Sequence, residues 1–212
     1  MNSANDTVLK ELKKVVGAEY VIHTPEDLIV FEYDGAVDKA TPLAVVIPET
    51  THEVSECVKV ARRHNLPVIA RGAGTGLSGG AIAEHGGIVI ALTKMTKILE
   101  VDQENRIAVV EPGVVNLDLT THIAPLGLYY APDPSSQRVC TIGGNVAENS
   151  GGPHCLAYGV TTNHVLAMEV VLADGSIQWI GGHPRESVGY VRRAIPVGPA
   201  RTLVIVPQVF AR

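Results

Sequence analysis

The chain has 212 residues, a formal net charge of −5 and 46% hydrophobic residues, and aromatic residues are scarce at 4%. That length is enough for one large or two small domains with a real hydrophobic core. The acidic balance excludes a basic footprint for nucleic acid or anionic membranes, and no apolar run approaches the ~20 residues that cross a bilayer. We therefore expect no nucleic-acid partner and no transmembrane segment.

Residues 1–37 are expected to form a helical arm. Within residues 6–16, the apolar side chains recur on one helical face, and Gly17 is a good helix stop. Thr24 then supplies an N-cap and Pro25 a first helical position for a short second helix through about Phe31. This arm has the pattern of a packing element and carries no evident chemistry.

A β-α-β unit follows the arm. Residues 43–47 predict a strand buried on both faces, and Thr50 with Glu53 predicts a capping box that opens a helix. Residues 66–70 return as a second strand. Such a unit places its two strands parallel with a right-handed crossover, so residues 38–97 are expected to form a small parallel first lobe.

A glycine-rich loop leaves the carboxyl end of that second strand, the edge where open α/β sheets bind ligands. Five glycines in ten residues let the backbone approach a ligand closely, and successive N–H groups can form an anion-binding concavity. Two hydroxyl groups and one arginine add further donors. The expected guest is a phosphate or pyrophosphate, and its candidate contacts are Arg71, Gly72, Ala73, Gly74, Thr75, Gly76, Leu77, Ser78, Gly79 and Gly80.

Two other interpretations of this loop remain open. Residues 74–79 fit the G-x-G-x-x-G fingerprint of nicotinamide enzymes, and Glu100 follows at about the 20-residue distance which that fingerprint requires. However, that fingerprint needs a helix to begin inside the loop, whereas residues 88–92 predict another strand. The loop could also be a glycine-rich surface loop without any ligand.

The second part of the chain, residues 98–212, is predicted to be a mostly antiparallel lobe. Residues 98–101 and 107–111 form an expected hairpin, and Asn116 is expected to cap a helix that runs to about Ala124. Residues 168–172 and 177–180 form a second hairpin around an Asp-Gly turn. A parallel lobe followed by an antiparallel lobe predicts the α+β fold class.

A second glycine cluster, residues 141–152, follows a rigid proline-rich turn and lies between these hairpins. So many glycines are not expected in a segment that forms core, so we expect the cluster to offer backbone donors to a ligand. Two such segments suggest one long ligand held between two lobes, and a flavin dinucleotide has that length. The candidate contacts here are Pro132, Asp133, Pro134, Ser135, Thr141, Gly143, Gly144, Asn145, Asn149, Ser150, Gly151, Tyr158 and Gly159.

From about Tyr33 to Tyr190, these motifs resemble the family of FAD-linked glycolate oxidase subunits and D-lactate and D-2-hydroxyglutarate dehydrogenases, which share the vanillyl-alcohol-oxidase (PCMH-type) FAD domain. The resemblance implies that residues 38–212 bind FAD between the two lobes, with Ile205 as a further contact. Covalently flavinylated relatives carry histidine where this chain has Thr75, which implies non-covalent FAD. The resemblance also implies that a hydride passes from a small 2-hydroxy acid to flavin N5. It further implies electron-transfer subunits, such as iron–sulfur proteins, as partners.

The chain departs from that family in two ways. Family members are about twice as long, and their second half, a substrate-capping domain with the metal-binding residues, is not expected here. Residues 197–205 also differ from the family pattern, since Pro199 lacks a backbone donor. An alternative function is therefore a truncated, non-catalytic FAD-binding module.

The catalytic residues remain unassigned at this stage, and no metal site is expected. Histidine is the usual general base by type. His85, His122, His154 and His164 are candidates for that role, but ordinary loop or helix roles suit each better. Asp133 and Glu148 are interpreted as loop supports.

The cysteines and the first residues indicate a cytoplasmic protein. Cys57, Cys140 and Cys155 are an odd, widely spaced set that matches no zinc spacing, as expected for reduced thiols. The first residues lack the basic and apolar regions of a signal peptide. We allow for membrane association through partner subunits.

Overall fold

The first sheet of the computed structural model, which describes residues 3–181 and 204–211, has the strand order β1-β2-β4-β3. Its strands are β1 (Val21–Ile22), β2 (Ala44–Val46), β3 (Val68–Arg71) and β4 (Ile88–Ala91). Both β2 and β3 pair in parallel with β4, and β1 adds an antiparallel edge. The parallel β-α-β unit is thus confirmed, with β4 inserted between its two strands.

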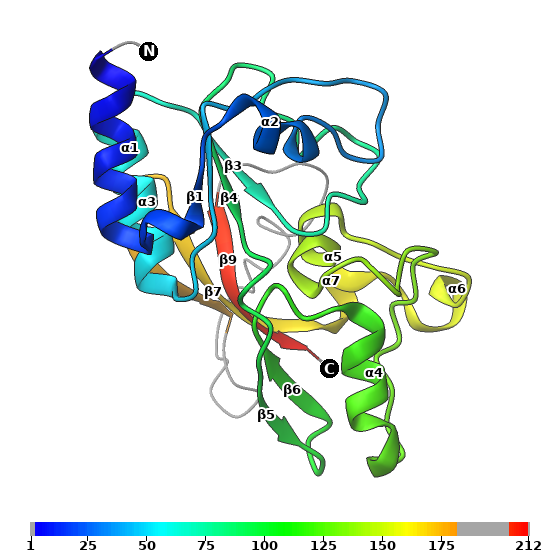
Figure 1. Cartoon of the computed structure of the whole chain (residues 1–212). Helices are drawn as coiled ribbons and strands as arrows, with labels where there is room; N and C mark the ends of the chain where they lie inside the picture. Colours follow the sequence, from blue (N-terminus) through cyan, green and yellow to red (C-terminus); the bar gives the residue numbers. More distant parts are fainter. Residues whose placement is uncertain (1–2, 182–203, 212) are drawn as a thin grey trace.

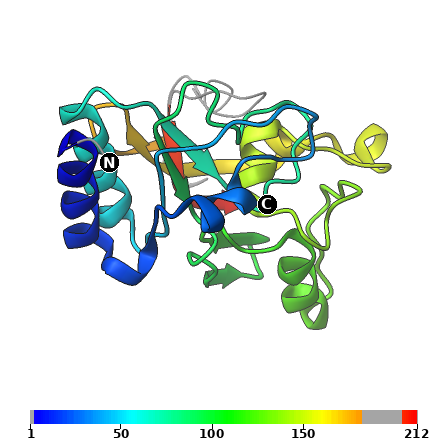
Figure 2. The same ribbon diagram turned by 45° about the horizontal axis from the view of Figure 1, so that its top comes forward.

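Helices cover the first sheet because its central strands are apolar on both faces. Helices α1 (Ser3–Val16) and α3 (Thr51–Arg63) lie together on one side, where Leu12 packs with Ile88 and Ile90 (Figures 1 and 2). On the other face, Val89 packs with Leu28 of α2 (Pro25–Leu28), which continues into a 3₁₀ turn at Ile29–Phe31. Alternating burial on two faces explains the unbroken apolar runs of these strands.

The second sheet is antiparallel throughout and has the order β5-β6-β9-β7-β8. Its strands are β5 (Ile98–Asp102), β6 (Ile107–Val110), β7 (Val165–Leu172), β8 (Ile177–Gly181) and β9 (Val204–Ala211). The central position belongs to β9, seen in red in Figure 1. Pro207 falls at a shift in the β7–β9 register, where a strand tolerates a residue without an N–H group. The divergent residues 197–203 lie outside the described residues.

The remaining helices belong to the second lobe. They are α4 (Asn116–Ile123), a 3₁₀ turn at Ala124–Leu126, α5 (Ile142–Glu148), α6 (Cys155–Tyr158) and α7 (Thr161–His164); a further 3₁₀ turn, Ala18–Tyr20, lies in the arm. None of the helices in the described ranges combines the length and apolarity needed to cross a bilayer.

Three local predictions were wrong in detail. The second glycine cluster is not excluded from the core: Ile142 and Val146 of α5 are fully buried in it. A Cβ at Gly143 would lie 2.6 Å from Pro112 Cβ, so this glycine allows close packing. Asn116 is not a cap, since Val115 occupies that position and the Asn116 amide donates to the Pro132 carbonyl at 2.9 Å.

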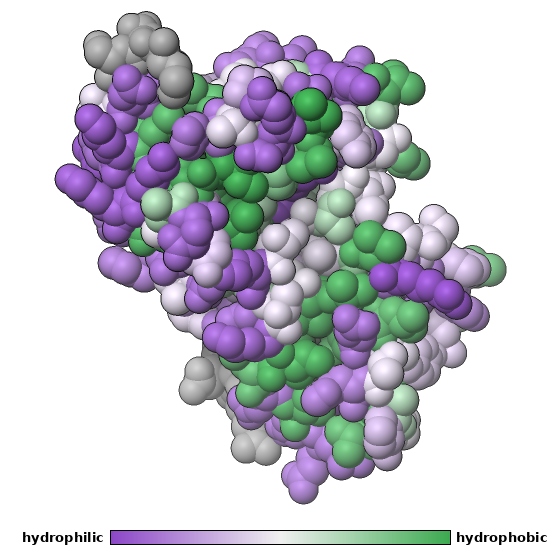
Figure 3. Space-filling model, in the orientation of Figure 1, coloured by the Kyte–Doolittle hydropathy of each residue, from purple (hydrophilic) through white to green (hydrophobic). Residues whose placement is uncertain are grey.

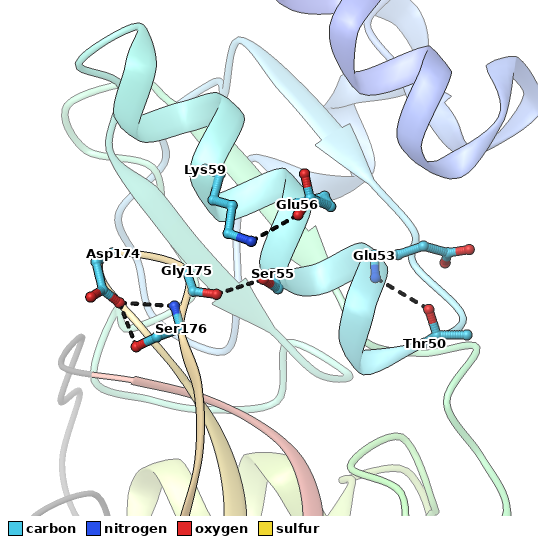
Figure 4. Close-up of polar contacts among 8 residues, drawn as sticks. All are labelled: Thr50, Glu53, Ser55, Glu56, Lys59, Asp174, Gly175 and Ser176. Atoms are coloured by element: carbon cyan, nitrogen blue, oxygen red, sulfur yellow. Dashed lines mark hydrogen bonds and ion pairs between the residues drawn. The ribbon is translucent and has the colours of Figure 1, made fainter.

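The start of α3 differs from the predicted capping box in one hydrogen bond. Thr50 caps α3 as predicted, but the Glu53 carboxylate accepts from the N–H of Glu49 at 2.6 Å, one residue before the cap. The hydrogen bond of the Thr50 side chain to the Glu53 N–H is drawn in Figure 4. The helix start is therefore as expected, with the reciprocal bond moved by one residue.

The two sheets are joined through α3. The buried Ser55 hydroxyl donates to the Gly175 carbonyl in the β7–β8 turn at 2.5 Å (Figure 4), and the Thr51 hydroxyl donates to Glu169 of β7 at 2.6 Å. Val171 and Ile205 of the second sheet also belong to the core cluster of the first. The cavity lies beside this junction, since Val171 and Ile205 also line it.

Candidate functional site

A cavity of about 710 Å³ lies between the glycine-rich loop, α5 and the start of the β7–β8 turn. The loop is on the first lobe and α5 on the second, so the cavity is built at the junction of the two. Thirteen residues singled out from the sequence line it: Gly72, Ala73, Gly74, Thr75, Gly76, Leu77, Gly80, Ser135, Thr141, Gly144, Asn145, Ser150 and Ile205.

The glycine-rich loop has unused backbone donors. Among the hydrogen bonds of the described residues, none is donated by an N–H group of residues 72–80. The loop is held instead through its carbonyl groups, because the Gly35 N–H donates to the Gly76 carbonyl at 2.8 Å. Gly74 and Gly79 have positive φ angles of 69° and 74°. A loop with this backbone and these free donors suits an anion.

Arg71 lies beneath the loop and does not line the large cavity. Its guanidinium packs 5.6 Å from the ring centroid of Phe31, and Nη2 is 3.5 Å from the Val30 carbonyl oxygen. Burial lowers the pKa of Arg71, and the nearby Asp34 opposes that shift. A Cβ at Gly74 would overlap the guanidinium, so the arginine supports the loop from below.

The second glycine segment contributes a wall and few backbone donors. The N–H groups of Ile142 and Gly143 donate to the carbonyls of Val114 and Pro112, both at 2.8 Å. The next two N–H groups both donate to Thr141. That of Gly144 donates to the Thr141 hydroxyl at 3.2 Å, and that of Asn145 donates to the Thr141 carbonyl at 2.8 Å. The expected donors at the start of α5 are therefore already used, and small side chains leave space for a ligand.

Asn145 is the polar exception in that wall. Its side chain is 1% exposed and lines the cavity, and neither its amide nitrogen nor its oxygen has a hydrogen-bond partner among the described residues. The buried Asp34 also lines the cavity with Oδ2 unpartnered. Unpaired buried polar atoms are costly, so these two groups favour a ligand with both donors and acceptors.

Two contacts bring the glycine segments together. A Cβ at Gly72 would overlap the Thr141 hydroxyl, so the first loop passes directly against the cap of α5. The Ser78 hydroxyl lies 2.6 and 2.8 Å from the two oxygens of Glu148, which is 70 residues further along the chain. The expected approach of the two segments is therefore present in the fold.

The other predicted residues do not line the large cavity. Asp133 lies 2.5 Å from His154 Nδ1, Pro132 accepts the bond from Asn116, and the Tyr158 ring packs edge-on against Tyr129. The set outside the cavity lining is Arg71, Ser78, Gly79, Pro132, Asp133, Pro134, Gly143, Asn149, Gly151, Tyr158 and Gly159. None of the four candidate histidines lines the cavity either.

Sequence reasoning missed several lining residues, among them Asp34, Arg62, Cys140 and Glu148. Asp34 and Arg62 lie in neither glycine-rich segment. Cys140 directly precedes the second glycine cluster but was considered only as a reduced thiol, and Glu148 was assigned only to loop support. Burial raises the pKa of the Cys140 thiol, so the group stays neutral near neutral pH and is not a ready nucleophile. In the described ranges, no group of three His, Cys, Asp or Glu side chains could hold a metal ion.

Comparisons with known proteins agree with this geometry. Residues 42–181 match the family described as "FAD binding domain". The chain is 41% identical over 204 residues to the glycolate oxidase subunit GlcD of Escherichia coli (strain K12), covering 96% of this chain and 41% of that protein. It is 41% identical over 171 residues to D-lactate dehydrogenase of Anaerostipes hadrus, covering 80% of this chain and 36% of that protein.

A solved structure shares the fold. The structure of p-cresol methylhydroxylase with substrate bound matches with a TM-score of 0.83 at 21% sequence identity, over 100% of this chain and 43% of that chain. This chain therefore spans less than half the length of each of these three proteins.

Proposed function

The chain belongs to the family of FAD-binding domains, and from that premise we propose that its cavity holds FAD with the pyrophosphate on the backbone of residues 72–80. FAD is the cofactor of this family, and the PCMH-type α+β fold is confirmed. The observation that carries the proposal is the row of unused N–H groups in a glycine loop that lines the cavity. An anionic pyrophosphate would satisfy these donors.

The rest of the cavity fits the other parts of a dinucleotide. One wall of the cavity has only small side chains, those of Gly144, Ala147 and Ser150, which leaves room for the ligand. The unpaired side-chain amide of Asn145 could hydrogen-bond to a polar ring edge or a hydroxyl group of the ligand. Thr75 stands where covalently flavinylated members of the family carry histidine, which supports non-covalent binding of FAD. The proposed binding unit runs over residues 38–212, with lobes at 38–97 and 98–212, and the arm of residues 1–37 adds α1 and β1 to the first lobe.

We extend the proposal to the flavin domain of a 2-hydroxy-acid oxidoreductase. The relatives of E. coli and A. hadrus are named for glycolate and D-lactate, and this chain covers 41% and 36% of them. Bound FAD would supply a hydride acceptor. The residues of this chain would bind the pyrophosphate, orient the cofactor between the lobes and shield one side of it from water.

We also propose partners and a location for this domain. The E. coli relative is named a subunit, so we propose that this domain works with further polypeptides, including electron-transfer proteins of the iron–sulfur or another class. Three unpaired cysteines support a cytoplasmic location, with membrane association through such partners.

A specific observation supports the alternative of a non-catalytic FAD-binding module. In the part of the chain that the structure describes, no histidine lines the cavity, so the commonest type of general base is not placed beside the proposed cofactor. A nicotinamide site is disfavoured because residues 81–87 form turns that lead into β4, where the fingerprint would need a helix.

The test is FAD titration followed by a turnover assay. The purified chain should quench flavin fluorescence on binding FAD and should not bind NADH. Thr75→Glu should abolish FAD binding, because its carboxylate would repel the pyrophosphate across the loop, whereas Thr75→Ser should retain it. Reduction of an artificial acceptor by glycolate or D-lactate would support the enzyme, and FAD binding without turnover would support the module. Undiminished FAD binding by Thr75→Glu would contradict the loop assignment.

A further inference from the structure

One buried carboxylate in the wall of the cavity has an oxygen without a partner. Asp34 is 7% exposed and lines the cavity together with the glycine-rich loop. Its Oδ1 accepts a hydrogen bond from the Ala36 N–H at 2.7 Å, whereas the buried Oδ2 has no hydrogen-bond partner among the described residues. An unpaired buried carboxylate oxygen is costly, so it points to a hydrogen-bond donor on the ligand.

The backbone fixes this carboxylate relative to the loop. Gly35, the next residue, donates its N–H to the Gly76 carbonyl at 2.8 Å. A Cβ at Gly35 would lie 2.7 Å from that same oxygen and 3.1 Å from the Thr75 carbonyl oxygen, so this segment is pressed against the loop. The bond from the Ala36 N–H holds the Asp34 side chain in a local turn. The free oxygen is therefore held close to the N–H groups that are proposed to bind the pyrophosphate.

The negative charge of Asp34 is offset under the loop. A Cβ at Gly74 would overlap the guanidinium of Arg71, which places this positive charge directly beneath the loop backbone. Burial lowers the pKa of Arg71, and the attraction of Asp34 opposes that shift. None of the ion pairs in the described ranges joins Asp34 to Arg71, so the arginine balances the charge without bonding the free oxygen. With the charge offset, the unused N–H groups of residues 72–80 still favour an anion.

The chemistry of the free oxygen limits what it can bind. An ionised carboxylate accepts hydrogen bonds and donates none, so the ligand has to supply the donor. A pyrophosphate inside a dinucleotide has only acceptor oxygens. In FAD, the donors closest to it are the hydroxyl groups of the two units that flank it, the ribose of the adenosine half and the ribityl chain of the flavin half. The adenine amine and the flavin ring N–H lie further along the molecule.

We propose that Asp34 is a specificity-determining residue of the FAD site, whose free carboxylate oxygen accepts a hydrogen bond from a sugar hydroxyl group beside the pyrophosphate. Acidic residues bind the ribose of dinucleotides with the same chemistry in other folds. This inference rests on the proposed FAD-binding function. Such a contact gives the arm of residues 1–37 a part in ligand binding, beyond the packing that its sequence pattern indicates.

The experiment measures the affinities of FAD and of two deoxy analogues for the full chain and for Asp34→Ser at neutral pH. One analogue carries 2′,3′-dideoxyribose in its adenosine half, and the other has a ribityl chain without its three free hydroxyl groups. We expect one of the two to bind the unmodified chain at least about tenfold more weakly than FAD, because hydrogen bonds to a charged group are the stronger kind. The analogue that loses affinity identifies the sugar that Asp34 holds.

The variant should remove that difference. Serine can still accept the Ala36 N–H bond but lacks the free oxygen, so Asp34→Ser should bind FAD and the weaker analogue within about threefold of each other. Both ligands meet the same altered site, so the ratio of their affinities cancels any effect of the substitution on the loop or on Arg71.

A matched control tests whether the position matters. Asp38→Ser removes a carboxylate from an exposed position of the same segment that does not line the cavity, and it should leave the ratio of affinities as in the unmodified chain. If Asp34→Ser does not fold by thermal melting, the isosteric Asp34→Asn replaces the charged acceptor by a neutral amide. It should reduce the difference between FAD and the weaker analogue by at least about threefold.

The outcomes separate this inference from the function on which it rests. If the chain binds FAD but neither analogue binds more weakly, the inference is wrong and the FAD site stands. A difference that persists unchanged in the Asp34 variant that folds, or that Asp38→Ser removes equally, overturns it in the same way. If the unmodified chain binds no FAD, the proposed function fails and this inference fails with it.

Discussion

Gly74 and Gly86 have nearly the same backbone conformation in different surroundings. Their φ angles are 69° and 68°, a region that costs any side chain about 1–2 kcal/mol. A Cβ at Gly74 would overlap the Arg71 guanidinium, whereas one at Gly86 would have no atom within 4 Å. The pair therefore separates the cost of the backbone angle from the cost of disturbing the loop.

Gly74→Ala is expected to lower FAD affinity by at least about tenfold, or about 1.4 kcal/mol, because the buried arginine under the loop must move. Gly86→Ala should destabilise the fold by the backbone cost alone and leave FAD affinity near that of the unmodified chain. Fluorescence titration and chemical unfolding measure the two effects. Equal losses of FAD affinity in both variants would show that the Arg71 contact does not matter.

Helices α1 and α3 are linked by an ion pair as well as by packing. Glu11 of α1 lies 2.6 Å from Arg63 Nη2 and 3.1 Å from His64 Nε2 at the end of α3. The hydrogen bond from Arg63, followed by that from His64, lowers the pKa of the Glu11 carboxyl below its ordinary value of 4.5. The charged carboxylate thus stabilises the folded chain above pH 4.5, and this contribution is lost as the pH falls toward the lower folded value.

Glu11→Gln is expected to reduce the free energy of unfolding by about 0.2–1 kcal/mol near neutral pH, since solvent screens this surface pair. The difference from the unmodified chain should disappear as the pH falls below the pKa of folded Glu11. Urea unfolding of both proteins across that pH range measures the difference in unfolding free energy near neutral pH and the pH at which it disappears. A difference that stays constant into acid would assign the effect of the substitution to packing, and the ion pair would then contribute nothing.

One of the contacts that join the two sheets is made by a buried hydroxyl group, that of Ser55. Ser55 on α3 points at the Gly175 carbonyl, and the nearby Ser176 hydroxyl bonds within its own turn to Asp174 (Figure 4). Of these two serine hydroxyls, only that of Ser55 bonds across from the first lobe to the second. Two serines in one neighbourhood therefore offer an internal comparison.

Ser55→Ala is expected to destabilise the chain by about 1–2 kcal/mol, because it leaves the Gly175 carbonyl without its partner in a buried site. Ser176→Ala should cost less than about 0.5 kcal/mol, since its bond is exposed and local. Thermal and urea unfolding of the two variants make the comparison. A Ser55→Ala protein as stable as Ser176→Ala would mean that the Ser55 bond adds nothing to the stability of the junction.

Apolar surface is exposed on both lobes. In the space-filling view, hydrophobic patches occur on each lobe of the face shown (Figure 3). Val37 is 95% exposed and Leu77, within the glycine loop, is 80% exposed. Large exposed apolar side chains commonly mark contact surfaces. Leu77 also lines the cavity, so part of this apolar surface lies at the candidate site.

Local features were readable from the residue order because they obey short-range rules. Helical periodicity and the Thr50 cap predicted α3, and turn residues predicted both hairpins. The glycine-rich loop predicted an anion-binding site, which stays a prediction. Each depends on torsion angles and on neighbours a few residues away. The family resemblance and the FAD cofactor rested on the same loop, and the family match confirmed them.

Contacts between distant residues needed the folded chain. The order of strands around β4, the central place of β9, the burial of Arg71 and the position of Glu148 over the loop all join segments far apart in sequence. The helix α5 was missed because its glycines look flexible in isolation, whereas packing of Gly143 against Pro112 makes them favourable. Local pattern cannot encode such contacts, since their energies come from partners that only the tertiary fold brings together.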